Sequence, residues 1–298
     1  MNTAYRSIGV GVMALLLVGG AFGVGVYAAV RSTSAHLPAA ATDGGQKAPA
    51  FLLDASVLEA KAAVLYDVHT GAVLYQKNAT EALPLASLTK LMAAQTVLSL
   101  NNPATLVVIT AEDLRPEGDS GLKPGETMAL GDLIKLALVA SSNDAITAAA
   151  ASLGDDPIAK MNTAARELGL TKTLFYNATG LDITERVSGA YGSAYDVARL
   201  ASLFYIDHAD FFELTTLPKI QVDGGNKEIS LAATALPLQD IPGFVAAKTG
   251  YTTLAGGNLV AIFDLQPGTT VAAVVLGSTH EGRFSDIKTI IEAARASL

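Results

Sequence analysis

Segments with the pattern of β-strands lie at both ends of the region from residue 50 to residue 298, whereas helical segments occupy its middle. Two extended runs flank a Thr-Gly turn and predict a β-hairpin over 62–76. Three more strands are expected at 244–249, 258–263 and 270–276. Strands from both ends bury their apolar faces best in one sheet, so we expect an α/β (α+β) fold: a mostly antiparallel sheet with flanking helices and an inserted helical lobe.

Apolar periodicity predicts a block of helices between these strands. A helix is expected to open at Ser87, and a short extended stretch at 105–110 follows it. The run Ser-Ala-Tyr-Asp at 193–196 has the pattern of a capping box at the start of another helix. The remaining expected helices cover 130–139, 143–153, 157–168, a stretch from 193 to about 205, and 285–297.

Three short strings of polar residues follow one another along the chain. They are Ser-Leu-Thr-Lys at 87–90, Ser-Ser-Asn at 141–143 and Lys-Thr-Gly at 248–250. Together they supply a hydroxyl nucleophile, a lysine that can deprotonate it, and a second serine–lysine pair. This combination is typical of acyl transfer through a serine ester, which requires no histidine, cysteine or metal.

Each string is short enough to occur by chance, so the functional copy is identified from the order of the strings and the residues around them. Ser-x-x-Lys recurs at 120–123, within a run of turn-forming residues, and at 285–288, after the Lys-Thr-Gly string. The copy at 87–90 differs, because Pro84 lies shortly before it and an apolar, helix-forming run follows it. Ser87 is therefore the candidate nucleophile.

The spacing of Ser87 and Lys90 suits a serine and its base. Residues three apart on a helix lie on one face, about 5–6 Å from each other. A free lysine has a pKa near 10.4, so that roughly one molecule in 2,500 is neutral at pH 7. We expect an apolar pocket, the helix N-terminus and the cation of Lys248 to lower the pKa of Lys90.

With these strings the chain resembles the penicillin-binding, serine-type D-alanyl-D-alanine carboxypeptidases of low molecular mass. The resemblance covers roughly residues 49 to 298 and implies a β-lactamase/transpeptidase-like fold. Two departures are visible: Ser142 stands where the family more often has glycine, and Ala178-Thr179 stands where it often has Pro-His. The matching segments are 84–92, 122–126, 143–145, Asn177 with 180–182, and 248–252 with 255–256.

The resemblance assigns a role to each candidate residue. Ser87, Lys90 and Ser141 would be catalytic, with Ser141 relaying a proton between Lys90 and the leaving amine. The backbone N–H groups of Ser87 and Tyr251 would form an oxyanion hole. The substrate-binding residues would be Asn143, Lys248, Thr249, Gly250, Tyr251 and Arg283. Arg283 is either a further contact to the substrate carboxylate or a solvated surface arginine.

These assignments imply a serine D,D-carboxypeptidase that removes the terminal D-alanine of peptidoglycan stem peptides through an acyl-enzyme. β-Lactams would be covalent inhibitors. A D,D-endopeptidase that cuts peptide cross-links would use the same residues and is the alternative. A membrane-tethered sensor that is acylated without turnover is a further alternative, although no catalytic residue is missing.

A β-lactamase is disfavoured by the glutamates of the chain. Such enzymes commonly carry Glu-x-x-x-Asn after the Ser-x-Asn string, for deacylation. The glutamates between Asn143 and Lys248 are followed at the fourth position by Thr, Gly, Leu and Ala, never by Asn. We therefore expect bound penicillin to be released slowly.

The N-terminal region predicts attachment to a membrane. Residues 8–30 carry no charge and would span about 34 Å as a helix, enough to cross a bilayer. We expect a cytoplasmic tail at 1–7, a transmembrane signal anchor at 8–30, a linker at 31–49 and an extracytoplasmic catalytic domain at 50–298. Cleavage of the hydrophobic segment as a signal peptide is the alternative and would make the protein secreted.

Composition excludes several other classes of function. The net charge is −8 and no basic run exceeds two residues, which argues against a nucleic-acid partner. The chain has no cysteine, and its four histidines show no metal-ligand spacing. We therefore expect neither a metal nor a cofactor.

Overall fold

The computed structural model describes residues 51, 53–118, 120–223 and 228–298. The tail, signal anchor and linker expected at 1–7, 8–30 and 31–49 lie outside these residues. Among the helices that are described, none combines the length and the apolar character needed to cross a bilayer.

A five-stranded sheet joins the two ends of the described region. Its strand order is β10-β11-β12-β1-β2, and every neighbouring pair is antiparallel. The first strand in sequence pairs with the last, with Ala62 opposite Leu276. The expected sheet is thereby confirmed. Its strands are β1 (Ala62–Asp67), β2 (Val73–Lys77), β10 (Phe244–Thr252), β11 (Gly256–Gln266) and β12 (Thr269–Ser278).

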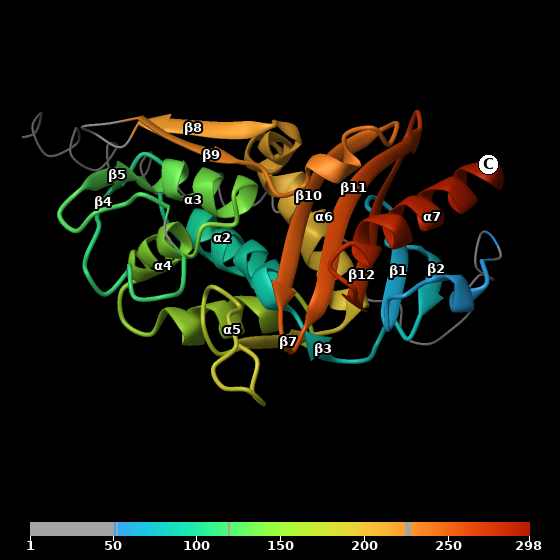
Figure 1. Cartoon of the computed structure of the whole chain (residues 1–298), viewed down its shortest axis with the longest axis horizontal. Coiled ribbons are helices and arrows are strands. Elements are labelled where there is room, and N and C mark those ends of the chain that lie inside the picture. The colour runs from blue at the N-terminus through green and yellow to red at the C-terminus, as the bar shows by residue number, and fades with distance from the viewer. Residues whose placement is uncertain (1–50, 52, 119, 224–227) are drawn as a thin grey trace, which may run out of the picture. The chain divides into compact units, whose positions relative to one another are not determined.

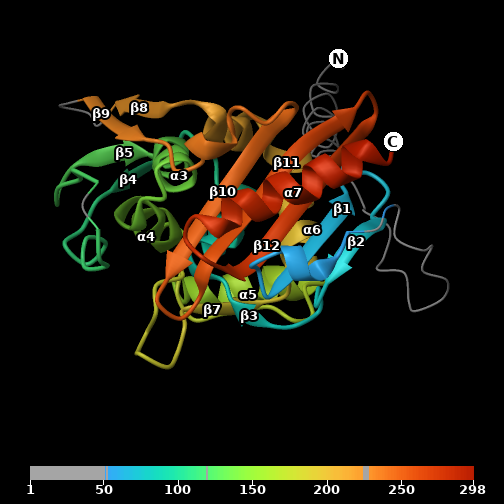
Figure 2. The same cartoon turned by 45° about the vertical axis from the view of Figure 1, so that its right-hand side comes forward.

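Both faces of this sheet are covered. Side chains alternate between the faces of a strand, and in β1 Val64 joins one apolar cluster while Leu65 joins the other. The C-terminal helix α7 (Gly282–Ala296) packs on the face of Leu65, and α6 (Ala194–Phe212) packs on the opposite face (Figures 1 and 2). The central strands are therefore apolar on both sides.

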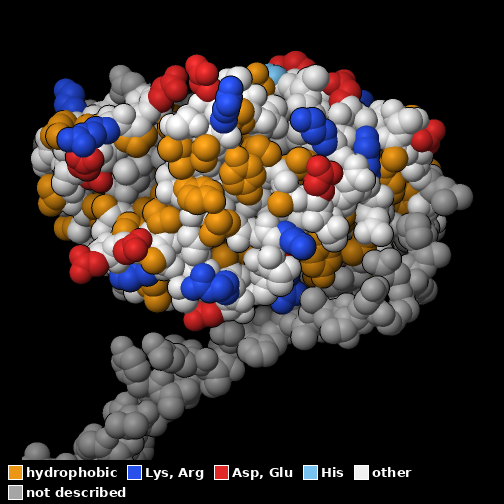
Figure 3. All heavy atoms as spheres, turned by 90° about the horizontal axis from the view of Figure 1, so that it is seen from below, with side chains coloured by type: hydrophobic (Ala, Val, Ile, Leu, Met, Phe, Trp, Pro, Cys, Tyr) orange, Lys and Arg blue, Asp and Glu red, His pale blue; other side chains and the backbone are white. Residues whose placement is uncertain are grey.

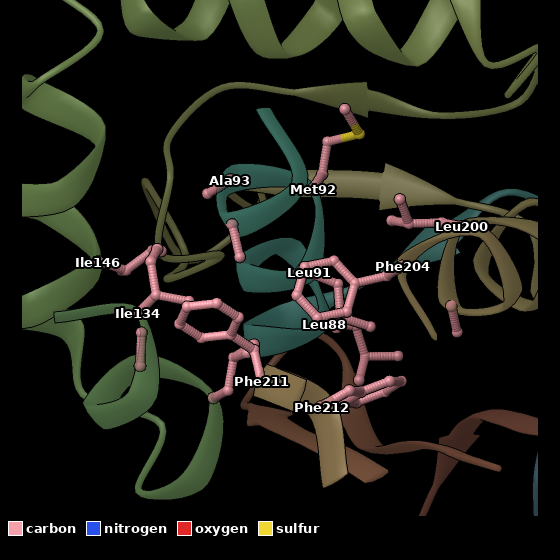
Figure 4. Packing of buried hydrophobic residues seen from close by; sticks show 14 of the residues in the cluster. Leu88, Leu91, Met92, Ala93, Ile134, Ile146, Leu200, Phe204, Phe211 and Phe212 are labelled. Atoms are coloured by element: carbon pink, nitrogen blue, oxygen red, sulfur yellow. The ribbon is translucent and has the colours of Figure 1, made fainter. Parts of the chain in front are cut away.

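The helical lobe is built around α2, which carries the Ser-x-x-Lys lysine. All residues of α2 from Thr89 to Leu98 are buried, because other helices surround it. Phe204, Phe211 and Phe212 of α6 belong to the same apolar cluster (Figure 4). The lobe comprises α2 (Thr89–Leu100), α3 (Leu130–Val139), α4 (Asn143–Ala151) and α5 (Pro157–Glu167).

Three small sheets complete the described fold, and two of them, β3-β7-β6 and β8-β9, were not expected. The hairpin of β8 (Lys219–Asp223) and β9 (Glu228–Ala232) packs on α3. Helix α6 is also longer than expected, since it continues beyond residue 205 to Phe212 through a non-helical His208. The other small strands are β3 (Leu83–Pro84), β4 (Leu106–Val108), β5 (Thr127–Ala129), β6 (Leu174–Phe175) and β7 (Ala190–Gly192).

One face of the molecule gathers apolar side chains. Seen from below, these side chains form an orange area, with charged groups of both signs around its margin (Figure 3). Separately, the exposed large apolar side chains of β6 and the loops that follow it include Leu174, Tyr176, Ile183 and Val187.

Candidate active site

Ser87 lies in a 3-10 turn, Ala86–Leu88, that leads directly into α2. Ala86 adopts a positive φ of 49°, an uncommon conformation for a residue with a side chain. Ala86 and Leu88 are buried, whereas Ser87 is only half-buried. The turn therefore anchors itself in the core and leaves the Ser87 hydroxyl accessible at the start of the helix.

Lys90 is fully buried and lies beside this hydroxyl. Its Nζ is 2.8 Å from Ser87 Oγ, 2.7 Å from Asn143 Oδ1 and 2.8 Å from the carbonyl oxygen of Thr179. A neutral amine has two N–H donors and one lone pair. The amide oxygen and the carbonyl can accept both donors, which directs the lone pair at the Ser87 hydroxyl. The three contacts thus accommodate both the ammonium form, with its three donors, and the neutral form that the reaction requires.

The charge state of Lys90 follows from its burial. Removal from water penalises the ammonium form and lowers the pKa of Lys90 to about 7. At pH 7 about half of the molecules then carry a neutral amine, compared with roughly one in 2,500 for a free lysine. This lysine can accept a proton from Ser87 at neutral pH.

A second buried lysine, Lys248 of β10, reaches Ser141. Its Nζ donates to Ser141 Oγ at 2.8 Å and to the carbonyl of Thr249 at 2.8 Å. Burial lowers the pKa of Lys248 well below its usual value, and the positive charges of Lys90 and Arg283 lower it further. Ser141 lies between α3 and α4 with a positive φ of 60°. An uncommon backbone conformation therefore occurs at the residue whose hydroxyl contacts the lysine.

The other residues of the Ser-Ser-Asn string have different contacts. Ser142, which departs from the family pattern, caps α4 by accepting a hydrogen bond from the N–H of Ala145 at 3.0 Å. Asn143 accepts from Lys90 through Oδ1 and donates through Nδ2 to the carbonyl of Glu117 at 2.6 Å. Since an amide nitrogen has two protons, Asn143 keeps a second donor for a substrate.

Strand β10 runs close to the nucleophile turn at Gly250. A Cβ at this position would lie 3.1 Å from Ser87 N, 3.1 Å from the carbonyl oxygen of Leu85 and 3.2 Å from Ala86 Cβ. Only glycine allows this approach without displacing the turn. The neighbouring Thr249 donates its hydroxyl to Thr234 Oγ1 at 2.7 Å. The Lys-Thr-Gly strand thus forms one wall beside Ser87.

Tyr251 and Arg283 lie at the end of this wall. The ring of Tyr251 is 53% exposed and packs edge-on against His280. Arg283 is only 5% exposed and donates from Nη1 to the carbonyl of Gly250 at 2.8 Å. The alternative of a solvated surface arginine is therefore wrong, because α7 begins at Gly282 and places this side chain against the sheet.

The segment 177–182, most of which matches the family pattern, makes contacts that the sequence did not assign. The carbonyl of Thr179 holds Lys90, although the sequence presents this residue only as a departure from Pro-His. Asn177 Oδ1 accepts from the N–H of Gly180 at 2.7 Å and fixes the turn. Asp182 accepts from Thr252 Oγ1 at 3.0 Å, which ties the segment to the end of β10. This segment therefore contacts both Lys90 and the end of β10.

Gly180 offers a sharp test of this packing. Its φ is +81°, and an added Cβ would lie 1.8 Å from the carbonyl oxygen of Ala86 in the nucleophile turn. We expect Gly180→Ala to lower the free energy of unfolding by about 4 kcal/mol or more, measured by urea denaturation.

Gly268→Ala is the matched control for this substitution. Gly268 has nearly the same φ, +82°, but nothing lies within 4 Å of its added Cβ. Gly268→Ala should lower the free energy of unfolding only by the cost of a left-handed backbone conformation in a residue with a Cβ, about 1–2 kcal/mol. Equal losses in the two variants would contradict the close packing of Gly180 on Ala86.

Comparison with known proteins agrees with this geometry. The family model described as D-alanyl-D-alanine carboxypeptidase, Peptidase S11, matches residues 49–280. D-alanyl-D-alanine carboxypeptidase DacF of Bacillus subtilis is 34% identical over 246 residues, which cover 79% of this chain and 62% of that protein. A D-alanyl-D-alanine endopeptidase of Haemophilus influenzae is 31% identical over 242 residues, which cover 78% of this chain and 81% of that protein.

The fold has relatives among solved structures. Penicillin-binding protein D2 from Listeria monocytogenes in the ampicillin-bound form superimposes with a TM-score of 0.70 and 31% identity, over 80% of this chain and 97% of that chain. The expected α+β fold of penicillin-binding proteins is thereby confirmed. The chain spans 60–62% of the length of the curated carboxypeptidases from B. subtilis and Escherichia coli that it matches. Since the family model matches well over half of the chain, the chain belongs to the D-alanyl-D-alanine carboxypeptidase family, Peptidase S11.

Proposed function

We propose that this protein is a serine D,D-carboxypeptidase that removes the terminal D-alanine of peptidoglycan stem peptides through an acyl-enzyme. The observation that carries the proposal is the 2.8 Å contact between Ser87 Oγ and Lys90 Nζ, together with a pKa near 7 for that lysine. β-Lactams acylate the same serine, and the ampicillin-bound relative supports this.

Acylation follows from the contacts around Ser87. Neutral Lys90 takes the Ser87 proton while Oγ attacks the carbonyl carbon of the penultimate D-alanine. The N–H groups of Ser87 and Tyr251 receive the negative charge of the tetrahedral intermediate. As the C–N bond breaks, Ser141 gives its hydroxyl proton to the leaving amine, which departs as free D-alanine. Ser141 takes the proton held by Lys90 in exchange, so that Lys90 is neutral again. A water molecule, activated by the same base, then hydrolyses the ester.

Substrate binding uses the positive charge of the site. The terminal carboxylate of the stem peptide lies near Lys248, whose charged form it favours. It accepts a hydrogen bond from the Thr249 hydroxyl, which then turns away from Thr234 Oγ1. Gly250 leaves room for the peptide backbone beside the nucleophile turn. The free Nδ2 proton of Asn143 donates to a substrate carbonyl. These groups, with water, complete the reaction without a metal or a cofactor.

An endopeptidase is the second candidate, because the Haemophilus influenzae relative carries that name. The two activities share the acylation step and differ in the group that leaves. Incubation with a pentapeptide substrate and with a cross-linked dimer separates them. We expect release of D-alanine from the pentapeptide to be the faster reaction. Preferential cleavage of the dimer would reassign the protein as an endopeptidase, and failure to turn over either substrate would favour a sensor.

Turnover of β-lactams provides an independent prediction. No glutamate in the Glu-x-x-x-Asn pattern is available between Asn143 and Lys248 to activate a water for penicilloyl-ester hydrolysis. We expect the labelled enzyme to persist for many minutes after excess penicillin is removed, and nitrocefin to be hydrolysed slowly. Nitrocefin hydrolysis at the rate of an efficient β-lactamase would overturn this expectation.

We also propose that residues 8–30 anchor the protein in the cell membrane. Residues 1–7 then lie in the cytoplasm, the linker 31–49 crosses the headgroup region, and the catalytic domain 50–298 faces peptidoglycan. The 23 uncharged residues of the hydrophobic run support this arrangement. Membrane fractionation and N-terminal sequencing test it, because a mature start beyond residue 27 rules out the anchor.

A further inference from the structure

Arg283 is a buried cation that is held by a backbone carbonyl. Its Nη1 donates to the carbonyl oxygen of Gly250 at 2.8 Å, and its Nη2 lies 3.2 Å from His280 Nε2. The guanidinium also lies over the ring of Phe284, 4.8 Å from its centroid. Among the described residues, no carboxylate forms an ion pair with Arg283 within 4.0 Å. A buried arginine that lacks a carboxylate partner requires a reason.

The carbonyl that Arg283 holds belongs to a particular peptide unit. The C=O of Gly250 and the N–H of Tyr251 are parts of the same planar, trans peptide and point in opposite directions. A donor that fixes the Gly250 oxygen therefore fixes the direction of the Tyr251 N–H. A cationic donor on the oxygen also polarises the peptide and strengthens its N–H as a hydrogen-bond donor.

This peptide unit lies next to the nucleophile, near the end of β10. Gly250 packs so closely on the turn that its added Cβ would be 3.1 Å from Ser87 N. The same absence of a Cβ gives the Gly250 backbone more rotational freedom than other residues have. The approach to Ser87 requires a glycine. Pairing of Gly250 with Asn258 and of Tyr251 with Gly257 already limits rotation of this peptide, and the hydrogen bond from Arg283 to the Gly250 oxygen adds a further, charged restraint.

We propose that Arg283 is a positioning residue that holds the Gly250–Tyr251 peptide so that the Tyr251 N–H faces the oxyanion formed at Ser87. The inference rests on the proposed acyl-enzyme chemistry. It differs from a contact between Arg283 and the substrate carboxylate, because the guanidinium acts through the protein backbone whether or not the substrate carries an acid.

That difference defines the test. The rate constant of Ser87 acylation is measured with a penicillin and with its methyl ester, which lacks the free carboxylate. We expect Arg283→Gln to slow acylation about 10- to 100-fold with both compounds, within the roughly 100- to 1,000-fold loss seen when an oxyanion-hole donor is removed. The dissociation constant of the complex that precedes acylation should change little, since that donor acts mainly on the transition state.

Two further variants complete the experiment. Arg283→Lys keeps a cationic donor and should recover part of the lost rate with both compounds. Arg199→Gln is the matched control, because Arg199 donates from Nε to the carbonyl of Leu168 at 2.9 Å, away from the site. It should leave acylation unchanged. Thermal unfolding of each variant reports folding, and Arg283→Lys decides the question if Arg283→Gln does not fold.

The other outcomes are also distinct. A loss confined to the carboxylate-bearing penicillin would overturn the inference in favour of a substrate contact, and unchanged acylation with both compounds would overturn it outright. Acylation of the wild type without D-alanine release from peptides would overturn the proposed carboxypeptidase and leave the role of Arg283 intact. A wild type that neither compound acylates would overturn both.

Discussion

Replacement of Ser87 by alanine is expected to abolish both D-alanine release and covalent labelling by penicillin. The substitution removes the oxygen that attacks the substrate and leaves the buried turn of Ala86 and Leu88 in place. Loss of the nucleophile in a serine peptidase reduces the rate by about six orders of magnitude. D-alanine release from a pentapeptide substrate and gel fluorescence with a labelled penicillin measure the two effects.

Ser285→Ala is the control for this substitution. Ser285 belongs to another Ser-x-x-Lys copy, but its hydroxyl donates to the carbonyl of Gly282 within α7. It should retain wild-type labelling and turnover. Labelling that persists in Ser87→Ala at the wild-type stoichiometry would place the nucleophile elsewhere and contradict the proposed mechanism.

Replacement of Lys90 by methionine is expected to slow acylation by about 1,000- to 10,000-fold, within the range measured for loss of a general base. Methionine keeps much of the volume that fills the core beneath Ser87 but cannot accept a proton. Lys77→Met is the matched control, because Lys77 donates to the carbonyl of Leu58 at 3.0 Å near the opposite edge of the sheet. The control should acylate at the wild-type rate.

The pH dependence of acylation identifies the base. Burial lowers the pKa of Lys90 to about 7, and only the neutral amine can take the Ser87 proton. The acylation rate of the wild type should therefore rise about tenfold per pH unit below pH 7 and level off above it. Lys90→Met should lack this acidic limb. A limb that persists in the variant with an unchanged midpoint would show that another group is the base.

Much of the fold could be predicted because its sheet is built from strong local patterns. The apolar runs at 62–67 and 270–276 lie within β1 and β12, which pair along their whole shared length. The extension of α6 to Phe212 was missed, since it passes through a non-helical His208 that local periodicity does not anticipate. Strand β8 of the β8–β9 hairpin has a sequence signal, because the buried Ile220 and Val222 alternate with polar residues.

The candidate site was predicted from its side chains. The contacts that the sequence did not predict are made mainly by backbone groups. The order of the three strings predicted that Ser87, Ser141 and Lys248 would meet, and the hydrogen bonds of Lys90 and Lys248 join these segments. The sequence does not predict that the carbonyl of Thr179 accepts from Lys90, because every residue has a carbonyl. The burial of Arg283 was equally hidden, since it depends on where α7 meets the sheet.

The central claim is that a neutral, buried lysine activates Ser87. The most direct measurement is mass spectrometry of the protein after incubation with a labelled penicillin, followed by proteolysis and sequencing of the modified peptide. We predict one adduct, attached to Ser87 and absent from Lys90→Met over the same incubation time. An adduct on Ser120, Ser141 or Ser285, or equally fast labelling of Ser87 in Lys90→Met, would contradict the mechanism.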